Sequence, residues 1–140
     1  MKKLCVVSVL LLVFWIGIRT SQAVHPKQQC QQQYGGKKDT ENCVLFCRLM
    51  HYKFVNNQFK IEKPYHVNMM ADFVRDKKAV KEGKEGLLKV HILNCRGKHG
   101  EVTKDDQTMA QKCKKMSAYS ECVRSGNPSV VDSAKFDSGL

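Results

Sequence analysis

Hydrophobic residues recur along much of the chain at steps of three and four, the spacing that places them on one face of an α-helix. One such stripe consists of Cys43, Cys47, Met50 and Phe54. A second consists of His66, Met69, Met70, Phe73 and Val74. The strict alternation that is typical of strands is weak throughout. The pattern therefore predicts an all-α fold, a compact bundle of five to six helices.

The boundaries of the first three helices follow from residues that begin or end helices. We expect a first helix over residues 26–34, because proline suits a first helical turn and two glycines follow Tyr34. A second helix is expected to begin near Asp39 or Thr40, either of which can cap it. A third is expected to start at or just after Pro64.

Two further helices are expected in the second half of the chain. Residues 78–96 predict a fourth helix that is ended by Gly97. Because its second half, LLKVHILNC, is apolar nearly all round, we expect that half to be buried. A fifth helix is predicted from a cap at Asp105 or Asp106 to Val123.

The N-terminal segment predicts a secretory signal peptide, residues 1–23. Lys2 and Lys3 precede an apolar run over residues 4–18, and small residues stand at Ser21 and Ala23. A membrane anchor is the alternative, but the run is shorter than the roughly 20 residues of a membrane-spanning helix. Cleavage after Ala23 would leave a single domain.

The rest of the chain divides into a body and a tail. Residues 24–124 are predicted to form the helical domain, and residues 125–140 a C-terminal tail. The tail has little periodicity, and we expect it to be mobile, although Val130, Val131 and Phe136 could dock on the body.

Charge adds a class of partner to this picture. The chain carries a net charge of +11 at pH 7, of which Lys2, Lys3 and Arg19 belong to the signal peptide, so +8 remains. Residues 75–98 hold eight basic and three acidic side chains. A basic extracellular protein favours polyanions such as sulfated glycans, polyphosphate or anionic surfaces.

Six cysteines remain once Cys5 leaves with the signal peptide. An even number in a small secreted chain indicates a disulfide framework, and six cysteines allow 15 pairings, which the spacing alone leaves open. Cys113 and Cys122 lie nine residues apart, which puts them on opposite sides of a helix and about 13 Å apart along it. They can therefore neither bond to each other nor share a metal. The six are Cys30, Cys43, Cys47, Cys95, Cys113 and Cys122.

The cysteine pattern resembles that of the insect odorant-binding protein superfamily. The matching elements are Cys-x3-Cys at Cys43 and Cys47 in an early helix and Cys-x8-Cys at Cys113 and Cys122 in a late one. The resemblance implies a helical fold stapled by three disulfides, with the pairs Cys30–Cys47, Cys43–Cys113 and Cys95–Cys122.

One departure from the odorant carriers is informative. Twelve residues separate Cys30 from Cys43, about half the number in a carrier, so a large enclosed pocket is not expected. The short N-terminus, the NNQF turn at residues 56–59 and the basic charge look more like the small salivary proteins of blood-feeding sand flies. That resemblance implies a saliva protein that binds anionic polymers and so inhibits contact-pathway coagulation.

The candidate polyanion-binding residues lie mainly on the predicted fourth helix. On that helix Lys78, Lys89 and Arg96 fall opposite the core stripe, but a solvated face with lysine–glutamate pairs is the plainer interpretation. Lys114 and Lys115 could extend the site, although the lysines around Cys113 spread about the helix. The full candidate set is Lys77, Lys78, Lys81, Lys84, Lys89, Arg96, Lys98, Lys114 and Lys115.

No motif for catalysis or metal binding stands out. The histidines are scattered, and neither G-x-S-x-G nor H-E-x-x-H occurs. We therefore expect a non-enzymatic, monomeric binding protein without cofactor or metal, which affects host coagulation factors only indirectly. One alternative is a carrier of a small hydrophobic or amphiphilic ligand, and another is a protein inhibitor or an antigen without a specific ligand. The residues that would form either a plain core or a carrier's pocket are Phe46, Met50, Phe54, Met69, Met70, Phe73, Met109 and Met116.

Overall fold

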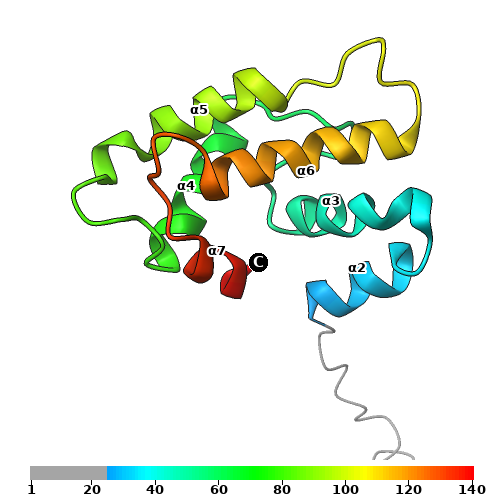
Figure 1. Ribbon diagram of the computed structural model, residues 1–140, viewed down its shortest axis with the longest axis horizontal. Coiled ribbons are helices and arrows are strands. Elements are labelled where there is room, and N and C mark those ends of the chain that lie inside the picture. The colour runs from blue at the N-terminus through cyan, green and yellow to red at the C-terminus, as the bar shows by residue number, and fades with distance from the viewer. Residues whose placement is uncertain (1–24) are drawn as a thin grey trace, which may run out of the picture.

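The described part of the protein is built from helices. The computed structural model describes residues 25–140, and the predicted signal peptide lies outside the described residues. Within this part there are six α-helices, two short 3-10 turns and one isolated β-bridge, so the all-α prediction is confirmed (Figure 1). The helices are α2 (Pro26–Tyr34), α3 (Glu41–His51), α4 (Tyr65–Asp76), α5 (Leu88–His99), α6 (Met109–Ser125) and α7 (Ser133–Gly139), and the 3-10 turns are η1 (Lys38–Thr40) and η2 (Glu85–Leu87).

The first three helices begin where the sequence indicates. Helix α2 has the predicted bounds, with Pro26 in its first turn. Thr40 stands at the N-cap position of α3, but its hydroxyl donates to the Tyr34 carbonyl at 3.1 Å and does not cap the helix. Helix α4 begins directly after Pro64. The starts of these three elements are therefore where the sequence predicts, although Thr40 does not provide the expected side-chain cap.

The prediction of a helix over residues 78–87, the first half of the expected fourth helix, is wrong. Lys78 and Gly83 have φ angles of 52° and 69°, in the left-handed region that a right-handed helix does not use. The chain instead forms a loop, then η2, and enters α5 only at Leu88. Gly97 lies inside α5 and does not end it. Glycine at position 83 is suited to the positive φ because it has no Cβ.

The predicted cap of the last long helix is also wrong. Helix α6 begins with a capping box, in which the Thr108 amide donates to Gln111 Oε1 at 2.9 Å and the Gln111 amide donates to Thr108 Oγ1 at 3.2 Å. Asp106 has a different role, since it accepts the Thr103 amide at 2.7 Å within the preceding loop.

The C-terminal segment is not the mobile tail that we expected. It contains α7, which Asp132 caps by accepting from the amides of Ala134 and Lys135. Phe136 is fully buried, and the Tyr52 hydroxyl donates to the Gly139 carbonyl at 3.2 Å. The helical segment is therefore part of the body.

Three disulfides fasten the long helices around α6. Cys43–Cys113 joins α3 to α6, Cys95–Cys122 joins α5 to α6, and Cys30–Cys47 joins α2 to α3. These are the pairs that the resemblance implied. Figure 1 shows α6 running between α5 and α3, so the two cysteines of α6 serve helices on opposite sides. The framework therefore links α2, α3, α5 and α6 covalently, and α4 and α7 are held by noncovalent contacts alone.

Candidate polyanion-binding surface

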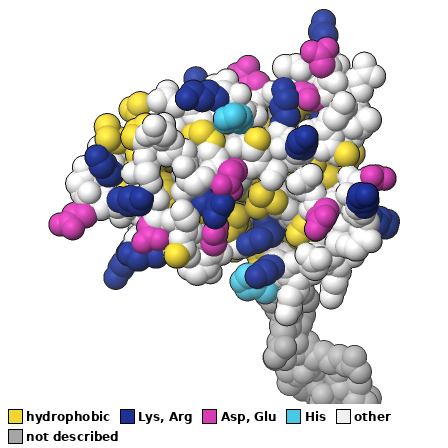
Figure 2. Space-filling model, in the orientation of Figure 1, with side chains coloured by type: hydrophobic (Ala, Val, Ile, Leu, Met, Phe, Trp, Pro, Cys, Tyr) yellow, Lys and Arg dark blue, Asp and Glu magenta, His cyan; other side chains and the backbone are white. Residues whose placement is uncertain are grey.

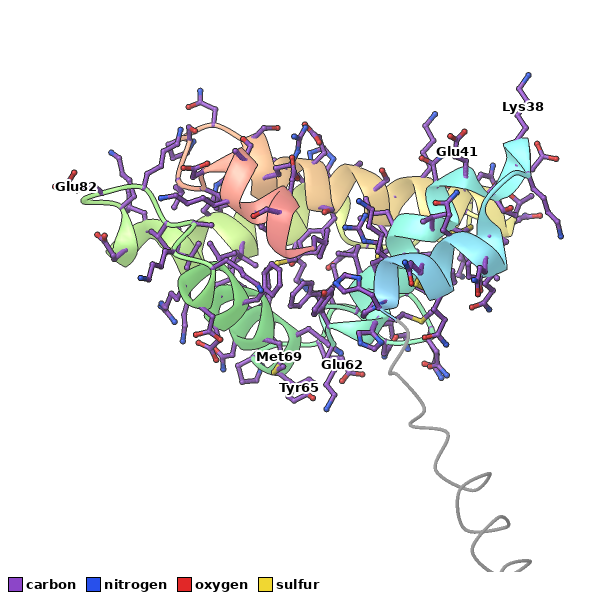
Figure 3. All side chains as sticks on the ribbon, turned by 90° about the horizontal axis from the view of Figure 1, so that it is seen from below. Lys38, Glu41, Glu62, Tyr65, Met69 and Glu82 are labelled. Atoms are coloured by element: carbon purple, nitrogen blue, oxygen red, sulfur yellow. A yellow bond between two sulfur atoms is a disulfide. The ribbon has the colours of Figure 1, made fainter. Side chains whose placement is uncertain are left out.

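Five candidate lysines lie close together in the chain segment between α4 and the first turn of α5. We call residues 77–89 the lysine loop. Its five lysines, which are all exposed, outnumber its two glutamates, Glu82 and Glu85. Figure 3 shows Glu82 at one extreme end of the molecule, so the loop forms a terminal surface that is open to a large partner. The lysines are Lys77, Lys78, Lys81, Lys84 and Lys89.

Backbone hydrogen bonds fix the lysine loop to the C-terminal segment. Val80 forms an antiparallel β-bridge with Val131. The Asp132 amide donates to the Ala79 carbonyl at 2.7 Å, and the Lys81 amide donates to the Val130 carbonyl at 2.9 Å. The start of the loop therefore has a defined path, although residues 77–84 are not helical.

The ammonium groups of the lysine loop are not neutralised within the described part of the protein. None of the five forms an ion pair with an acidic residue between positions 25 and 140. Lys81 Nζ donates to the Ser129 hydroxyl, and Lys77 Nζ lies 5.7 Å from the ring centroid of Phe73. Both contacts leave the positive charge uncompensated.

Arg96, another candidate, has a structural role. Its Nε donates to the Ile61 carbonyl at 2.7 Å, and its guanidinium pairs with Glu101 at 3.2 Å. Only 22% of the side chain is exposed. Arg96 therefore connects α5 to two loops, and the prediction that it shares a helix face with Lys78 is wrong because Lys78 is not in the helix.

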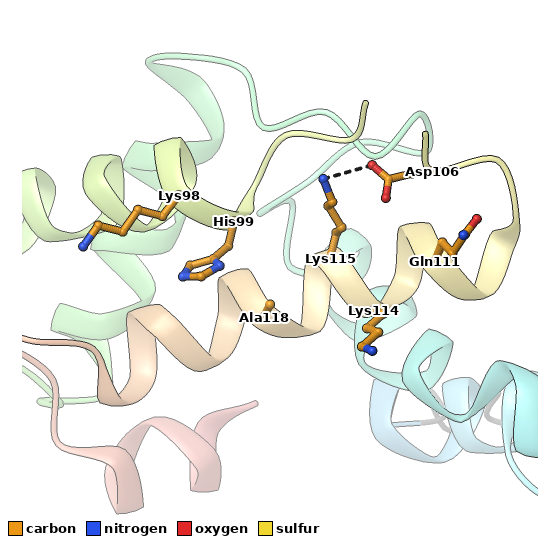
Figure 4. A pocket seen from close by; sticks show the side chains of 7 residues that line it. All are labelled: Lys98, His99, Asp106, Gln111, Lys114, Lys115 and Ala118. Carbon is orange, nitrogen blue, oxygen red and sulfur yellow. Dashed lines mark ion pairs between the residues drawn. The ribbon is translucent and has the colours of Figure 1, made fainter. Parts of the chain in front are cut away.

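Lys98, Lys114 and Lys115 lie together at a different place. They line a groove of about 280 Å³ between the end of α5 and the start of α6 (Figure 4). Lys115 Nζ pairs with Asp106 at 3.0 Å and donates to the Glu101 carbonyl at 3.2 Å. The full lining is Lys98, His99, Asp106, Gln111, Lys114, Lys115 and Ala118.

The charges in this groove partly cancel. The Thr103 amide, with help from Lys115, holds the pKa of the Asp106 carboxyl below its usual range, so Asp106 stays negative beside Lys115. Lys98 lies nine positions after Lys89, which places the two on opposite sides of α5. The candidate set is thus divided between the lysine loop and this groove.

The lysines around Cys113 point in different directions, as the sequence predicts. Lys112 Nζ lies 5.9 Å from the ring centroid of Phe59, and Lys115 is paired with Asp106. Lys114 is exposed and has no ion pair with any described residue. Of these three, only Lys115 forms an ion pair with a described residue, so Lys112 and Lys114 both keep an uncompensated charge.

Sequence reasoning missed the exposed side of α5. Leu87 is 44% exposed and Val90 is 54% exposed, whereas Leu88 and Ile92 are fully buried. The expectation that the whole LLKVHILNC stretch is buried is therefore wrong on one side. The apolar residues of this stretch are distributed nearly all round the helix, so their pattern does not indicate which side faces solvent.

The methionines and phenylalanines of the carrier alternative lie mostly in the packed core. Met70 and Met116 are fully buried, and the rings of Phe46 and Phe59 stack with centroids 3.9 Å apart. Met109 is 51% exposed and lies outside the core. These contacts are those of a filled interior.

A membrane-spanning element is missing from the described residues. No helix between positions 25 and 140 combines the length and the apolar character that crossing a bilayer requires.

The chain has similar proteins among those already known. No protein-family model matches it. "Salivary protein 15b" of Phlebotomus duboscqi is 25% identical over 130 residues, which cover 91% of this chain and 86% of that protein. "Salivary protein 15a" of the same organism is 25% identical over 129 residues, with the same coverage. The chain is thus similar to sand fly salivary proteins over most of its length, and the resemblance to the wider odorant-binding superfamily stays a prediction.

Proposed function

We propose that this is a secreted salivary protein that binds extracellular anionic polymers through its lysine loop. The polymers are of the class of sulfated glycans and polyphosphate. By covering them, the protein would deprive the proteases of contact-pathway coagulation of the surface on which they are activated.

Two findings support the extracellular setting. The similar proteins of Phlebotomus duboscqi are named as salivary proteins. All six cysteines in the described part of the chain form disulfides, which persist in oxidising compartments such as the extracellular space. The predicted signal peptide agrees with both.

The observation that carries the proposal is the set of unpaired ammonium groups on a fixed loop. Other exposed lysines are also unpaired, but the loop brings five of them together within 13 residues of chain, and none of the five forms an ion pair with a described residue. Lysine is a flexible point charge, suited to a polymer whose phosphates or sulfates have no fixed geometry. Each contact releases condensed counterions, so several weak contacts add up to a useful affinity.

Binding of dextran sulfate and polyphosphate across a salt series tests this proposal. We expect the logarithm of the binding constant to fall linearly with the logarithm of salt concentration, and neutral dextran not to bind. Absent or salt-independent binding would remove the proposal. Displacement of a bound hydrophobic dye by a small amphiphile would favour the carrier alternative instead.

A clotting assay tests the physiological part separately. The protein should delay clotting of plasma that is triggered by polyphosphate, and should leave clotting triggered downstream of the contact pathway unchanged. An equal delay in both assays would point to a protease as the target.

A further inference from the structure

The lysine loop runs into a pair of exposed aliphatic side chains. Leu87 is 44% exposed and Val90 is 54% exposed. Only two other large hydrophobic residues in the described part of the chain are comparably exposed, Tyr65 and Met109, and they begin α4 and α6. Leu87 and Val90 are thus a local feature of the end of the molecule that carries the lysine loop.

The aliphatic side chains line up with a lysine. The Leu87 amide donates to the Lys84 carbonyl at 2.9 Å, which closes the 3-10 turn η2. Residues three apart in such a turn are nearly eclipsed, so Lys84 and Leu87 share a side. Val90 lies three residues further and projects from the same side of α5. The half-buried Leu93 continues the row.

The neighbouring surface is cationic. Lys89 is exposed and stands one turn before Leu93 on α5. Figure 2 shows hydrophobic side chains gathered at the upper left of the molecule, over the start of α5, with lysine or arginine side chains next to them. Exposed aliphatic side chains beside lysines supply the two kinds of contact, apolar and cationic, that an anionic membrane surface can accept.

We propose that this edge docks on the surface of an anionic phospholipid bilayer. Leu87 and Val90 enter the boundary between headgroups and acyl chains, while Lys84 and Lys89 lie at the level of the lipid phosphates. The inference rests on the proposed function, because the same lysines supply the attraction. It extends that function from polymers in solution to a lipid surface, where burial of exposed aliphatic side chains in the apolar layer is favourable.

Charge argues for a bilayer and against a second copy of the chain as the occupant. The lysine loop holds five lysines and two glutamates, so two copies that met through this edge would bring like charges together. An anionic bilayer offers the opposite charge and an apolar layer beneath it.

Co-sedimentation with lipid vesicles tests the inference. The protein should sediment with vesicles of equal parts phosphatidylcholine and phosphatidylserine, and not with phosphatidylcholine alone. The double variant Leu87→Ser/Val90→Ser should bind the anionic vesicles at least about tenfold more weakly, because it loses the apolar contact. Its affinity for dextran sulfate should not change. Met109→Ser removes an equally exposed apolar residue on α6 and should bind vesicles as the wild type does.

Each other outcome overturns the inference in a recognisable way. If the double variant binds anionic vesicles like the wild type, the attraction is purely electrostatic. If the wild type binds dextran sulfate but not vesicles, the membrane inference fails and the proposed function stands. If it binds neither, both fail. If sedimentation velocity shows a wild-type dimer that the double variant loses, the edge is an interface between copies.

Discussion

Val80 in the lysine loop pairs with Val131 in the C-terminal segment as an antiparallel β-bridge. The hydrogen bond from the Asp132 amide to the Ala79 carbonyl lies directly beside it. The path of the lysine loop therefore depends on the segment that follows α6. Residues 130–132, which are not part of a basic cluster, therefore help to position the unpaired ammonium groups of the lysine loop.

The buried ring of Phe136 should be the main anchor of that segment. It is fully buried and lies edge-on to Phe73, with centroids 5.9 Å apart. We expect Phe136→Ala to lower the free energy of unfolding by about 3–5 kcal/mol, because it leaves a cavity between α4 and α7. Urea denaturation followed by circular dichroism measures the change. Ser138→Ala, at an exposed position of α7, should change stability by less than about 0.5 kcal/mol, and equal effects of both variants would show that the segment is not anchored.

Arg96 should matter for stability and not for polyanion binding. Arg96→Lys loses the hydrogen bond to the Ile61 carbonyl and weakens the contact to Glu101. We expect unfolding to become easier by about 1.5–3 kcal/mol, the range for hydrogen bonds to charged groups, while affinity for dextran sulfate stays the same. Lys98→Gln, an exposed change on the same helix, is the control for stability. Weaker polymer binding by Arg96→Lys would show that Arg96 contacts the polymer.

The disulfides should differ in how much they stabilise the fold. Cys43–Cys113 closes 70 residues and Cys30–Cys47 closes 17. Chain-entropy arguments give about 4.4 kcal/mol for the first and about 3.1 kcal/mol for the second. We therefore expect the double alanine variant of Cys43 and Cys113 to melt at a lower temperature than that of Cys30 and Cys47. The reverse order would mean that strain or residual structure in the unfolded chain outweighs loop length.

Tyr119 should make stability fall at alkaline pH. Burial raises the pKa of this phenol well above its ordinary value. The unfolded chain ionises Tyr119 above about pH 10, while the folded protein keeps it neutral. Stability is therefore complete below that pH and decreases above it, and Tyr119→Phe should remove part of the decrease. Denaturant midpoints of the two proteins between pH 8 and about 11 measure the effect.

Two comparisons make the Tyr119 result specific. Tyr65 is 50% exposed, so Tyr65→Phe should leave the alkaline decrease unchanged. At neutral pH Tyr119→Phe should be at least as stable as the wild type, because the Tyr119 hydroxyl is buried with no hydrogen-bond partner among the described residues. A loss of stability at neutral pH would show that the hydroxyl is in fact satisfied.

The helical framework could be predicted from the sequence because its determinants are local. Pro26 stands in the first turn of α2, where its fixed φ suits a helix. Cys113 and Cys122 lie nine positions apart on one helix, and this spacing requires two separate partners. The wider disulfide pairing needed the family resemblance, since spacing alone left it open.

The lysine loop could not be predicted, because its path is set by a contact that is distant in sequence. The apolar spacing of residues 78–96 fits a helix, but the bridge from Val80 to Val131 holds the start of this stretch in an extended form. Gly83 and Gly86, which both disfavour a helix, were the local signs of this loop in the sequence. The exposure of Leu87 and Val90 was hidden for a related reason, because burial depends on which side of α5 meets α6.

The most direct test of the account compares two triple variants with the same loss of charge. Lys78→Gln/Lys84→Gln/Lys89→Gln removes three charges from the lysine loop. Lys37→Gln/Lys38→Gln/Lys60→Gln removes three exposed lysines elsewhere, and Figure 3 shows Lys38 at the opposite end of the molecule from Glu82. For polyphosphate binding across a salt series, we predict that the loop variant loses affinity and that its salt slope falls by about three, or about one per lysine. The control variant should change the slope by less than about one. Equal losses in the two variants would show that net charge alone binds the polymer, and would contradict a site at the lysine loop.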